Sequence, residues 1–195
     1  MNLSFQKRWL TSAMALSIVT LLTACSKTVQ WKEEVQLNDG RIIVVTQKKR
    51  CEGGDYSAKT GATCIARESW LMINLPEFSE KEILWHESLK PMIVNINEKQ
   101  LYVVGRPPTT LEFRAYGATT PPYFGFIWDK GSWKRIPFKE IPEAIYNANM
   151  LIESIPSART DFLDLKVKNS DAENGNPVYP LQLRKIDPKY TTSAY

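Results

Sequence analysis

Short runs of alternating apolar and polar residues, each ended by a turn sequence, constrain this chain more than any other feature. The clearest case begins at Trp31, where Val35 and Leu37 share its parity. Asn38-Asp39-Gly40 follows, and then the β-branched run 42–45. Asp-Gly suits a two-residue hairpin turn because glycine accepts a positive φ without a steric penalty. The pattern therefore predicts an antiparallel hairpin over 31–45.

Further strand-like runs follow at intervals marked by proline, glycine or aspartate. Regular spacing of short strands with turn signals between them is typical of a meandering antiparallel sheet. We therefore expect a mainly β domain built as a sandwich or a partly open barrel. The predicted strands are 69–75, 83–85, 92–94, 101–104, 111–115, 123–128 and 132–136.

The period of the apolar residues changes after Pro137. Pro142 is tolerated only in the first turn of a helix, and Pro156 cannot continue one. Apolar side chains between these prolines recur at the i, i+3, i+4 and i+7 spacing of one helix face. The sequence predicts a C-terminal amphipathic helix around 142–155 and an α+β class. The helical positions are Ile141, Ala144, Ile145, Ala148, Leu151, Ile152 and Ile155.

The N-terminal segment has the design of a lipoprotein signal peptide. Lys7 and Arg8 precede a mostly apolar run that ends in Leu22-Thr23-Ala24-Cys25. This run is shorter than the roughly 20 apolar residues a membrane span requires. An uncleaved signal anchor is the alternative. The predicted organisation is a signal peptide at 1–24, a lipidated tether at 25–30, one β-rich periplasmic domain at 31–187 and a flexible tail at 188–195.

Cys25 is the predicted lipidation site, and its acyl chains would be the contact with the membrane. Stable anchoring requires at least two chains, a condition that a diacylglyceryl cysteine bearing a further palmitate-type chain meets. Ser26 follows the cysteine. In enterobacterial-type lipoproteins, which this segment resembles, aspartate at that position favours retention in the inner membrane. Ser26 therefore predicts an anchor in the outer membrane, on its periplasmic face.

Two cysteines remain once Cys25 carries lipid. Cys51 and Cys64 enclose 12 residues, and the periplasm is oxidising, so we predict a disulfide between them. A loop of that size would stabilise the fold by about 3 kcal/mol in the chain-entropy model. A metal site needs more ligands than two cysteines. The single histidine, His86, has neither cysteine nor histidine beside it, so no metal or other cofactor is expected.

The charge balance gives no support for a nucleic-acid partner, and we expect none. The whole chain has a formal charge of +4, of which Lys7 and Arg8 supply two positive charges and no acidic residue precedes Cys25. The predicted mature chain is therefore close to neutral. It shows no basic stripe interleaved with aromatic residues, the pattern typical of a nucleic-acid interface.

No catalytic motif is visible. The sequence has no nucleophile elbow, phosphate-binding glycine loop or histidine metal motif. His86 has only nearby glutamates as candidate partners for general-base chemistry, so a surface position is the favoured interpretation. Carboxylate pairs such as Glu33/Glu34 and Asp161/Asp164 match what glycoside hydrolysis needs, but pairs like these also occur on any soluble domain.

The aromatic residues near the end of the meander are the best binding candidates. Phe126 and Trp128 share one face of a predicted strand, and Trp133 lies across the following turn. Exposed, they would suit sugar rings or a partner protein. Buried, they would form core and cross-strand pairs, and this is the interpretation we favour.

The chain resembles uncharacterised proteobacterial lipoproteins, a family with no known activity, so the resemblance assigns no functional residue. We expect a non-catalytic binding or envelope-scaffolding module, with an envelope protein or peptidoglycan as partner. A cell-wall hydrolase or modifying enzyme and a lysozyme-type inhibitor are the alternatives. The resemblance rests on Trp31-Lys32-Glu33-Glu34-Val35, Leu37, Asp39-Gly40-Arg41 and Ile43-Val44-Val45, and on Gly131, Trp133 and Arg135-Ile136-Pro137.

Overall fold

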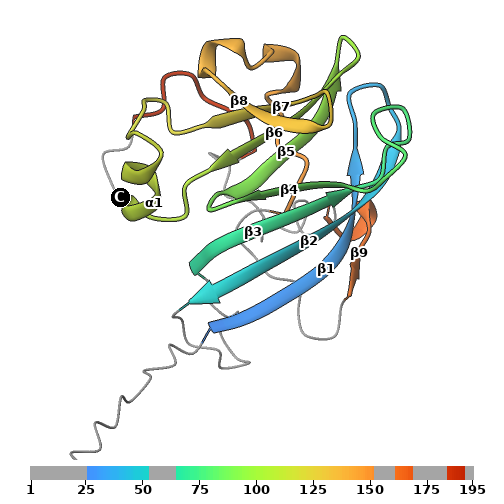
Figure 1. Cartoon of the computed structure of the whole chain (residues 1–195), viewed down its shortest axis with the longest axis horizontal. Helices are drawn as coiled ribbons and strands as arrows, with labels where there is room; N and C mark the ends of the chain where they lie inside the picture. Colours follow the sequence, from blue (N-terminus) through green and yellow to red (C-terminus); the bar gives the residue numbers. More distant parts are fainter. Residues whose placement is uncertain (1–25, 53–64, 152–160, 169–183, 192–195) are drawn as a thin grey trace, which may run out of the picture.

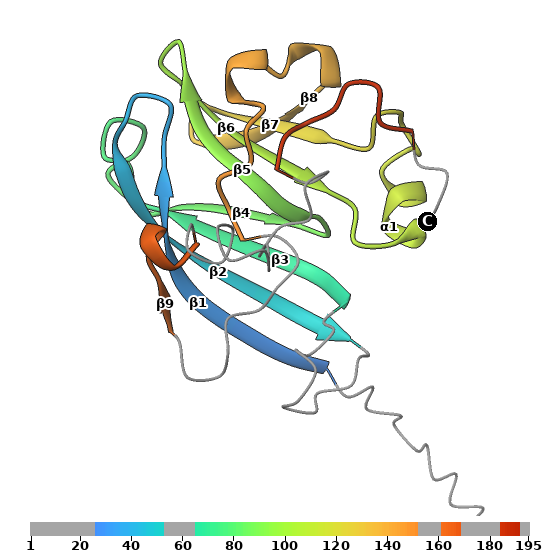
Figure 2. The same cartoon turned by 180° about the vertical axis from the view of Figure 1, so that it is seen from behind.

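Two antiparallel meanders build the protein, as the computed structural model of residues 26–52, 65–151, 161–168 and 184–191 shows (Figures 1 and 2). The first meander forms a five-stranded sheet in the order β4-β3-β2-β1-β9, in which the short β9 joins β1 in parallel. Its strands are β1 (Ser26–Gln36), β2 (Ile42–Glu52), β3 (Ile65–Ile73), β4 (Ile83–Glu87) and β9 (Phe162–Leu163).

The second meander forms a four-stranded sheet in the order β5-β6-β7-β8. No strand pairing among the described residues joins the two sheets into a closed barrel. The prediction of a mainly β chain with meandering antiparallel strands is therefore confirmed, and its strands divide between two open sheets. The strands of the second sheet are β5 (Lys90–Asn97), β6 (Gln100–Arg106), β7 (Phe124–Asp129) and β8 (Ser132–Ile136).

The hairpin predicted over 31–45 is present and is longer than expected. Gly40 has a φ of +86°, the left-handed conformation that its turn requires. The Leu37 amide donates to the Arg41 carbonyl oxygen at 2.8 Å and closes the turn. Pairing continues from Gln36 opposite Ile42 to Ser26 opposite Glu52. The turn sequence therefore fixes the register of both long strands.

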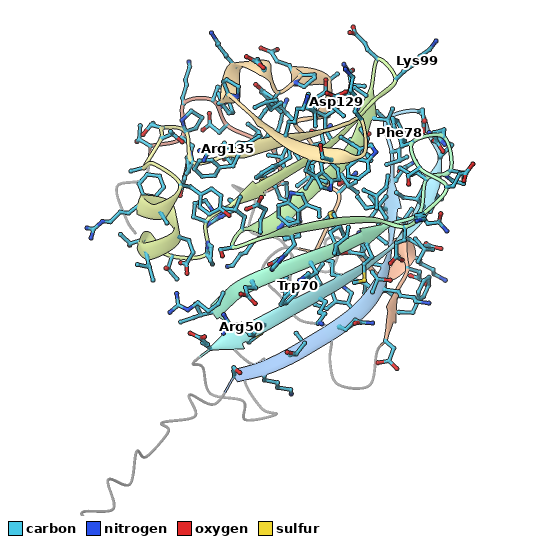
Figure 3. The ribbon with its side chains drawn as sticks, in the orientation of Figure 1. Arg50, Trp70, Phe78, Lys99, Asp129 and Arg135 are labelled. Atoms are coloured by element: carbon cyan, nitrogen blue, oxygen red, sulfur yellow. The ribbon has the colours of Figure 1, made fainter. Side chains whose placement is uncertain are left out.

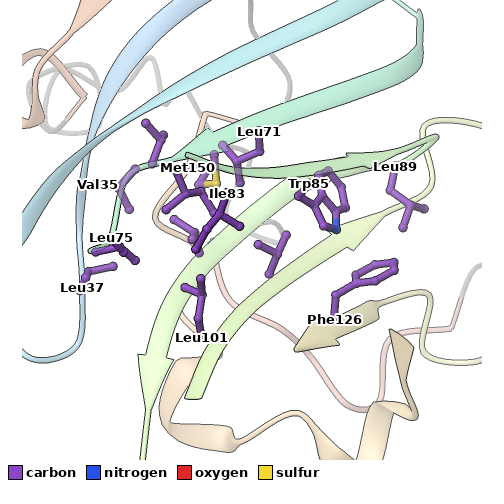
Figure 4. Close-up of a cluster of buried hydrophobic side chains, with 14 of the residues drawn as sticks. Val35, Leu37, Leu71, Leu75, Ile83, Trp85, Leu89, Leu101, Phe126 and Met150 are labelled. Carbon is purple, nitrogen blue, oxygen red and sulfur yellow. The ribbon is translucent and has the colours of Figure 1, made fainter. Parts of the chain in front are cut away.

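Alternation along the strands places one apolar core between the sheets (Figure 4). Val35, Leu71 and Trp85 face inward from the five-stranded sheet, and Val103 and Phe126 face them from the four-stranded sheet. The Trp85 and Phe126 rings meet edge to face, with centroids 5.6 Å apart, a favourable aromatic geometry. Burial of a large apolar side chain contributes roughly 1.5–3 kcal/mol, so this cluster is the main source of stability.

A second apolar cluster covers the other face of the four-stranded sheet. The chain after Pro137 lies across that face, together with residues 184–191 near the C-terminus. The four-stranded sheet is thus buried on both faces, whereas the five-stranded sheet has one face in solvent. The buried members of this cluster are Met92, Ile93, Val104, Tyr123, Ile136, Ile141, Ile145, Tyr146 and Ile186.

The predicted helix around 142–155 is wrong over its described part, 142–151. That segment contains only the 3-10 turn η2 (Glu143–Ile145), after the 3-10 turn η1 (Phe138–Glu140). Its backbone pairs elsewhere instead: the Ala148 amide donates to the Arg184 carbonyl oxygen at 2.7 Å, and the Ile186 amide donates to Tyr146 at 2.9 Å. Residues 152–155 lie outside the described residues.

The apolar residues of 142–151 belong to three separate clusters, so their helical spacing does not reflect a helix. Ile145 packs on the outer face of the four-stranded sheet, Met150 enters the core between the sheets, and Leu151 packs beside Trp31. The predicted helix would have put Ile145 and Leu151 in one apolar stripe, whereas the observed chain places them in different clusters. Tertiary packing therefore overrides the local period.

The strand predicted at 111–115 is instead the short helix α1 (Thr110–Ala115). The Thr109 hydroxyl oxygen accepts a hydrogen bond from the Leu111 amide at 3.2 Å, a helix N-cap. Alternation over so few residues cannot distinguish a strand from a helix of one and a half turns. Thr109, a favourable N-cap residue, was the feature of the sequence that indicated a helix.

The described parts of the predicted tether (25–30) and of the predicted tail (188–195) both contact the domain. Residues 26–30 belong to β1 and pair with 48–52 of β2. Near the other end, the Tyr190 amide donates to the Asp187 carbonyl oxygen at 3.0 Å, and the Tyr190 ring packs near Tyr123. Cys25 and residues 192–195 lie outside the described residues.

Candidate functional site

Two of the three predicted modification residues, Cys25 and Cys64, lie outside the described residues. Cys51 is described: it is the penultimate residue of β2, its side chain is fully buried, and it is disulfide-bonded. Its pairing with Cys64 and the acylation of Cys25 stay predictions.

The three candidate binding aromatics lie together, at different depths. Phe126 is core. Trp128 and Trp133 are direct cross-strand partners whose rings meet at 5.3 Å, and both are partly exposed while packing against the core. The Trp133 indole nitrogen donates to the Leu84 carbonyl oxygen at 3.0 Å. The Trp133 side chain therefore links the β7–β8 hairpin to β4. Only the exposed parts of Trp128 and Trp133 are open to a ligand.

A buried charge cluster, consisting of Glu33, Gln47 and Lys168, lies on the inner face of the five-stranded sheet. The Lys168 ammonium donates to Glu33 Oε2 at 2.8 Å, with side chains 5% and 0% exposed. It also donates to the Asn149 carbonyl oxygen at 2.7 Å. Glu33 Oε1 accepts from the Gln47 amide nitrogen. A charge this deep is tolerated only when paired and hydrogen-bonded.

The buried charge cluster fastens distant segments to β1. Glu33 Oε2 also accepts from the Leu151 amide at 3.0 Å, and the Gln47 amide donates to the Leu151 carbonyl oxygen at 3.0 Å. Both oxygens of Glu33 are thus occupied by the chain itself. The sequence pattern indicated Glu33 only as part of a possible carboxylate pair, although the alternation that buries Trp31 and Val35 also buries Glu33.

Of the carboxylate pairs considered for glycoside hydrolysis, Glu33 and Glu34 lie on opposite faces of the sheet. Glu33 points inward, while Glu34 points outward and accepts from the Leu165 amide at 3.0 Å. Asp164 Oδ1 accepts from the Val167 amide at 2.7 Å within its own turn. Adjacent strand residues face opposite sides of a sheet, so Glu33 and Glu34 cannot share a substrate.

The solvent-facing side of β1–β4, here called the open face, carries an apolar patch formed by Ile42, Val44, Met72 and Leu84. Ile42 is 55%, Val44 47% and Leu84 52% exposed. Met72 lies directly beside Leu84 across the β3–β4 pair. Single exposed apolar residues are ordinary, but a contiguous group on one face is typical of an interaction site.

A cross-strand row of Lys48, Trp70 and His86 borders the apolar patch; Figure 3 labels Trp70. The Trp70 and His86 rings stack with centroids 4.7 Å apart and planes 12° apart. The Lys48 ammonium lies 4.8 Å from the Trp70 ring centroid, within cation–π range. His86 is exposed, as the surface interpretation predicted.

The rim of the apolar patch is basic. Lys32 and Lys48 belong to the open face on either side of Thr46, and neither forms an ion pair in the described part of the chain. The nearby Arg41, by contrast, is bound to Asp39 and to Glu77, the latter at 2.6 Å. The positive charge available at the rim therefore comes from lysine.

The described residues offer no candidate metal centre and no membrane-spanning helix. They contain no group of three or more histidine, cysteine or acidic side chains placed to hold a metal ion. In the same parts of the chain, no helix is long and apolar enough to span a bilayer. Comparison of the chain with protein-family models, with curated proteins and with solved structures gave no match.

Proposed function

We propose that this protein is a lipid-anchored, non-catalytic binding module of the bacterial outer membrane, which captures an acidic envelope protein on its open face. The observation that carries the proposal is the apolar patch of Ile42, Val44, Met72 and Leu84. The lipobox ending in Cys25 supports the anchor and the periplasmic location.

The chemistry of the open face defines the partner. An apolar centre with a polar rim is the usual anatomy of a protein–protein interface. Lys32 and Lys48 make the rim positive, so an acidic partner surface gains affinity and is steered toward it. The described carboxylates near this rim are already engaged, Glu34 by the Leu165 amide and Glu77 by Arg41.

Photo-crosslinking in living cells tests the proposal. A photoreactive amino acid at Val44 or Leu84 is expected to capture one discrete partner, whereas the same residue at exposed Lys139, on the far side of the four-stranded sheet, is expected to capture none. Capture of peptidoglycan or of a second copy of this chain would contradict the proposal. Equal capture from the open face and from Lys139 would contradict it as well.

A second measurement addresses the anchor. Replacing Cys25 with Ala is expected to prevent acylation and to move the protein from the outer membrane to the uncleaved or soluble fraction. Mass spectrometry of the purified wild-type chain should find the diacylglyceryl group on Cys25. A wild-type chain that lacks this group would refute the anchor.

A further inference from the structure

The folded sheet begins immediately after the predicted anchor. Ser26, the residue next to Cys25, already pairs with Glu52 as the first residue of β1. Consecutive Cα atoms are only about 3.8 Å apart. An acylated Cys25 therefore leaves no flexible spacer between the acyl chains and the domain.

The end of the sheet that adjoins this position carries linked ion pairs of alternating sign. Arg50 binds Glu68 at 3.0 Å and also binds Glu52. Arg67 binds Glu52 at 3.2 Å and Glu112 at 2.8 Å. These arginine side chains are 31% and 26% exposed, so the network is reachable from solvent.

A surface of this kind matches a zwitterionic headgroup layer. A guanidinium has five donors, so an arginine bound to a carboxylate keeps donors for a lipid phosphate. A paired glutamate likewise keeps lone pairs for a lipid ammonium. Because the charges already balance one another, contact with the headgroups does not bury an unpaired ion.

We propose that this end of the five-stranded sheet, formed by Ser26–Thr28, Arg50–Glu52 and Ile65–Glu68, faces zwitterionic phospholipid headgroups. The inference deepens the proposed function and depends on its lipidated Cys25. Val44 is paired with Glu34, eight residues along β1 from Ser26. At about 3.3 Å per residue, Val44 then lies roughly 26 Å along the sheet from the residue next to the anchor. Figure 3 shows Arg50 and Lys99 at opposite ends of the molecule.

Energy transfer in vesicles tests this orientation. Full-length acylated protein is reconstituted in phosphatidylethanolamine vesicles that carry an acceptor dye on the headgroup. A fluorescent amino acid replaces Thr28 or, as the matched control, Lys99; both positions are exposed. Transfer from position 28 is expected to be several-fold stronger than transfer from position 99.

A linker variant sharpens the result. Twelve Gly and Ser residues inserted between Cys25 and Ser26 span about 19 Å on average. The insertion is expected to weaken transfer from position 28 and to remove most of the difference from position 99. Equal transfer from both positions in the uninserted chain, or no change on insertion, would overturn the orientation.

Mass spectrometry separates the two possible failures. If Cys25 carries the acyl groups and the two positions transfer equally, only the orientation is wrong and the anchor stands. If Cys25 carries no acyl group, both the anchor and the orientation fail.

Discussion

The inner face of the five-stranded sheet has two halves that are equally buried and are held together differently. Toward the hairpin turn, Val35, Leu71 and Trp85 meet the other sheet through apolar contacts. Toward the start of β1, the buried Glu33 carboxylate is stabilised by hydrogen bonds from Lys168 and from the Leu151 backbone. Apolar packing is non-directional, whereas a buried charge depends on particular partners.

Sequence distance adds to this difference. The apolar half is built mainly from strands joined by short turns, whereas the charged half brings together residues more than 100 positions apart. Buried polar atoms without a hydrogen-bond partner in the described structure occur in both halves: Trp31 Nε1, Gln47 Oε1 and Ser69 Oγ in the charged half, and Trp85 Nε1 in the apolar half. Each such atom costs about 1–3 kcal/mol. The charged half contains more of these atoms and therefore carries the larger energetic cost.

The largest effect is expected when one member of the buried ion pair is removed. Lys168→Met leaves the Glu33 charge buried without its counter-ion, which costs about 3–5 kcal/mol. Urea denaturation measures the loss. The double variant Glu33→Gln with Lys168→Met should recover part of it, since it also removes the stranded charge. Full stability of the single variant would remove the distinction between the two halves.

The apolar half is expected to lose comparable stability by truncation but to tolerate a conservative exchange. Phe126→Ala removes a core ring that touches Trp85, at a cost of about 3–5 kcal/mol. Phe126→Leu keeps most of the apolar volume and should cost clearly less. Trp133→Ala should cost less than Phe126→Ala because the indole is partly exposed. Thermal melts that rank Trp133→Ala above Phe126→Ala would contradict this assignment.

An intermediate effect is expected at Glu112, a mostly buried carboxylate that pairs with Arg67 at 2.8 Å. Burial alone would raise the pKa of Glu112, but hydrogen bonds from Thr109 and Arg67 outweigh it and lower the pKa below 4.5. A lowered folded-state pKa gives stability that is present above about pH 5 and is lost as the pH falls through that pKa.

Replacing this carboxylate tests the sign of the effect. Glu112→Gln should cost about 1.5 kcal/mol at neutral pH, the lower end for a hydrogen bond to a charged group. It should also flatten the fall in the free energy of unfolding between pH 5 and pH 3. An acid dependence identical to that of the wild-type chain would refute the coupling.

The smallest effect on stability is expected on the open face. Val44→Ser and Leu84→Ser change exposed side chains, so each should alter the free energy of unfolding by no more than about 0.5 kcal/mol. Both variants should nevertheless lose the crosslinked partner. A large loss of stability would show that these side chains are structural.

The fold was predictable where local signals agreed. Asn38-Asp39-Gly40 fixed the first hairpin, and the predicted strands from 69–75 to 132–136 are present except at 111–115. Phe126 was correctly assigned to the core. The open face was not predicted, because a sequence shows which residues alternate but not which face of a sheet another layer covers.

By itself, the sequence determined the strands, their turns and their antiparallel order, because alternation and turn chemistry act over a few residues. Only the tertiary structure decided that 142–151 is not a helix, since Ile145 and Leu151, which the sequence pattern assigned to one helix face, pack in two separate clusters. The tertiary structure likewise decided that Glu33 is buried and paired with Lys168. A charge on the buried side of β1 is stable only because folding brings Lys168 within 2.8 Å of it, and no local pattern encodes that contact.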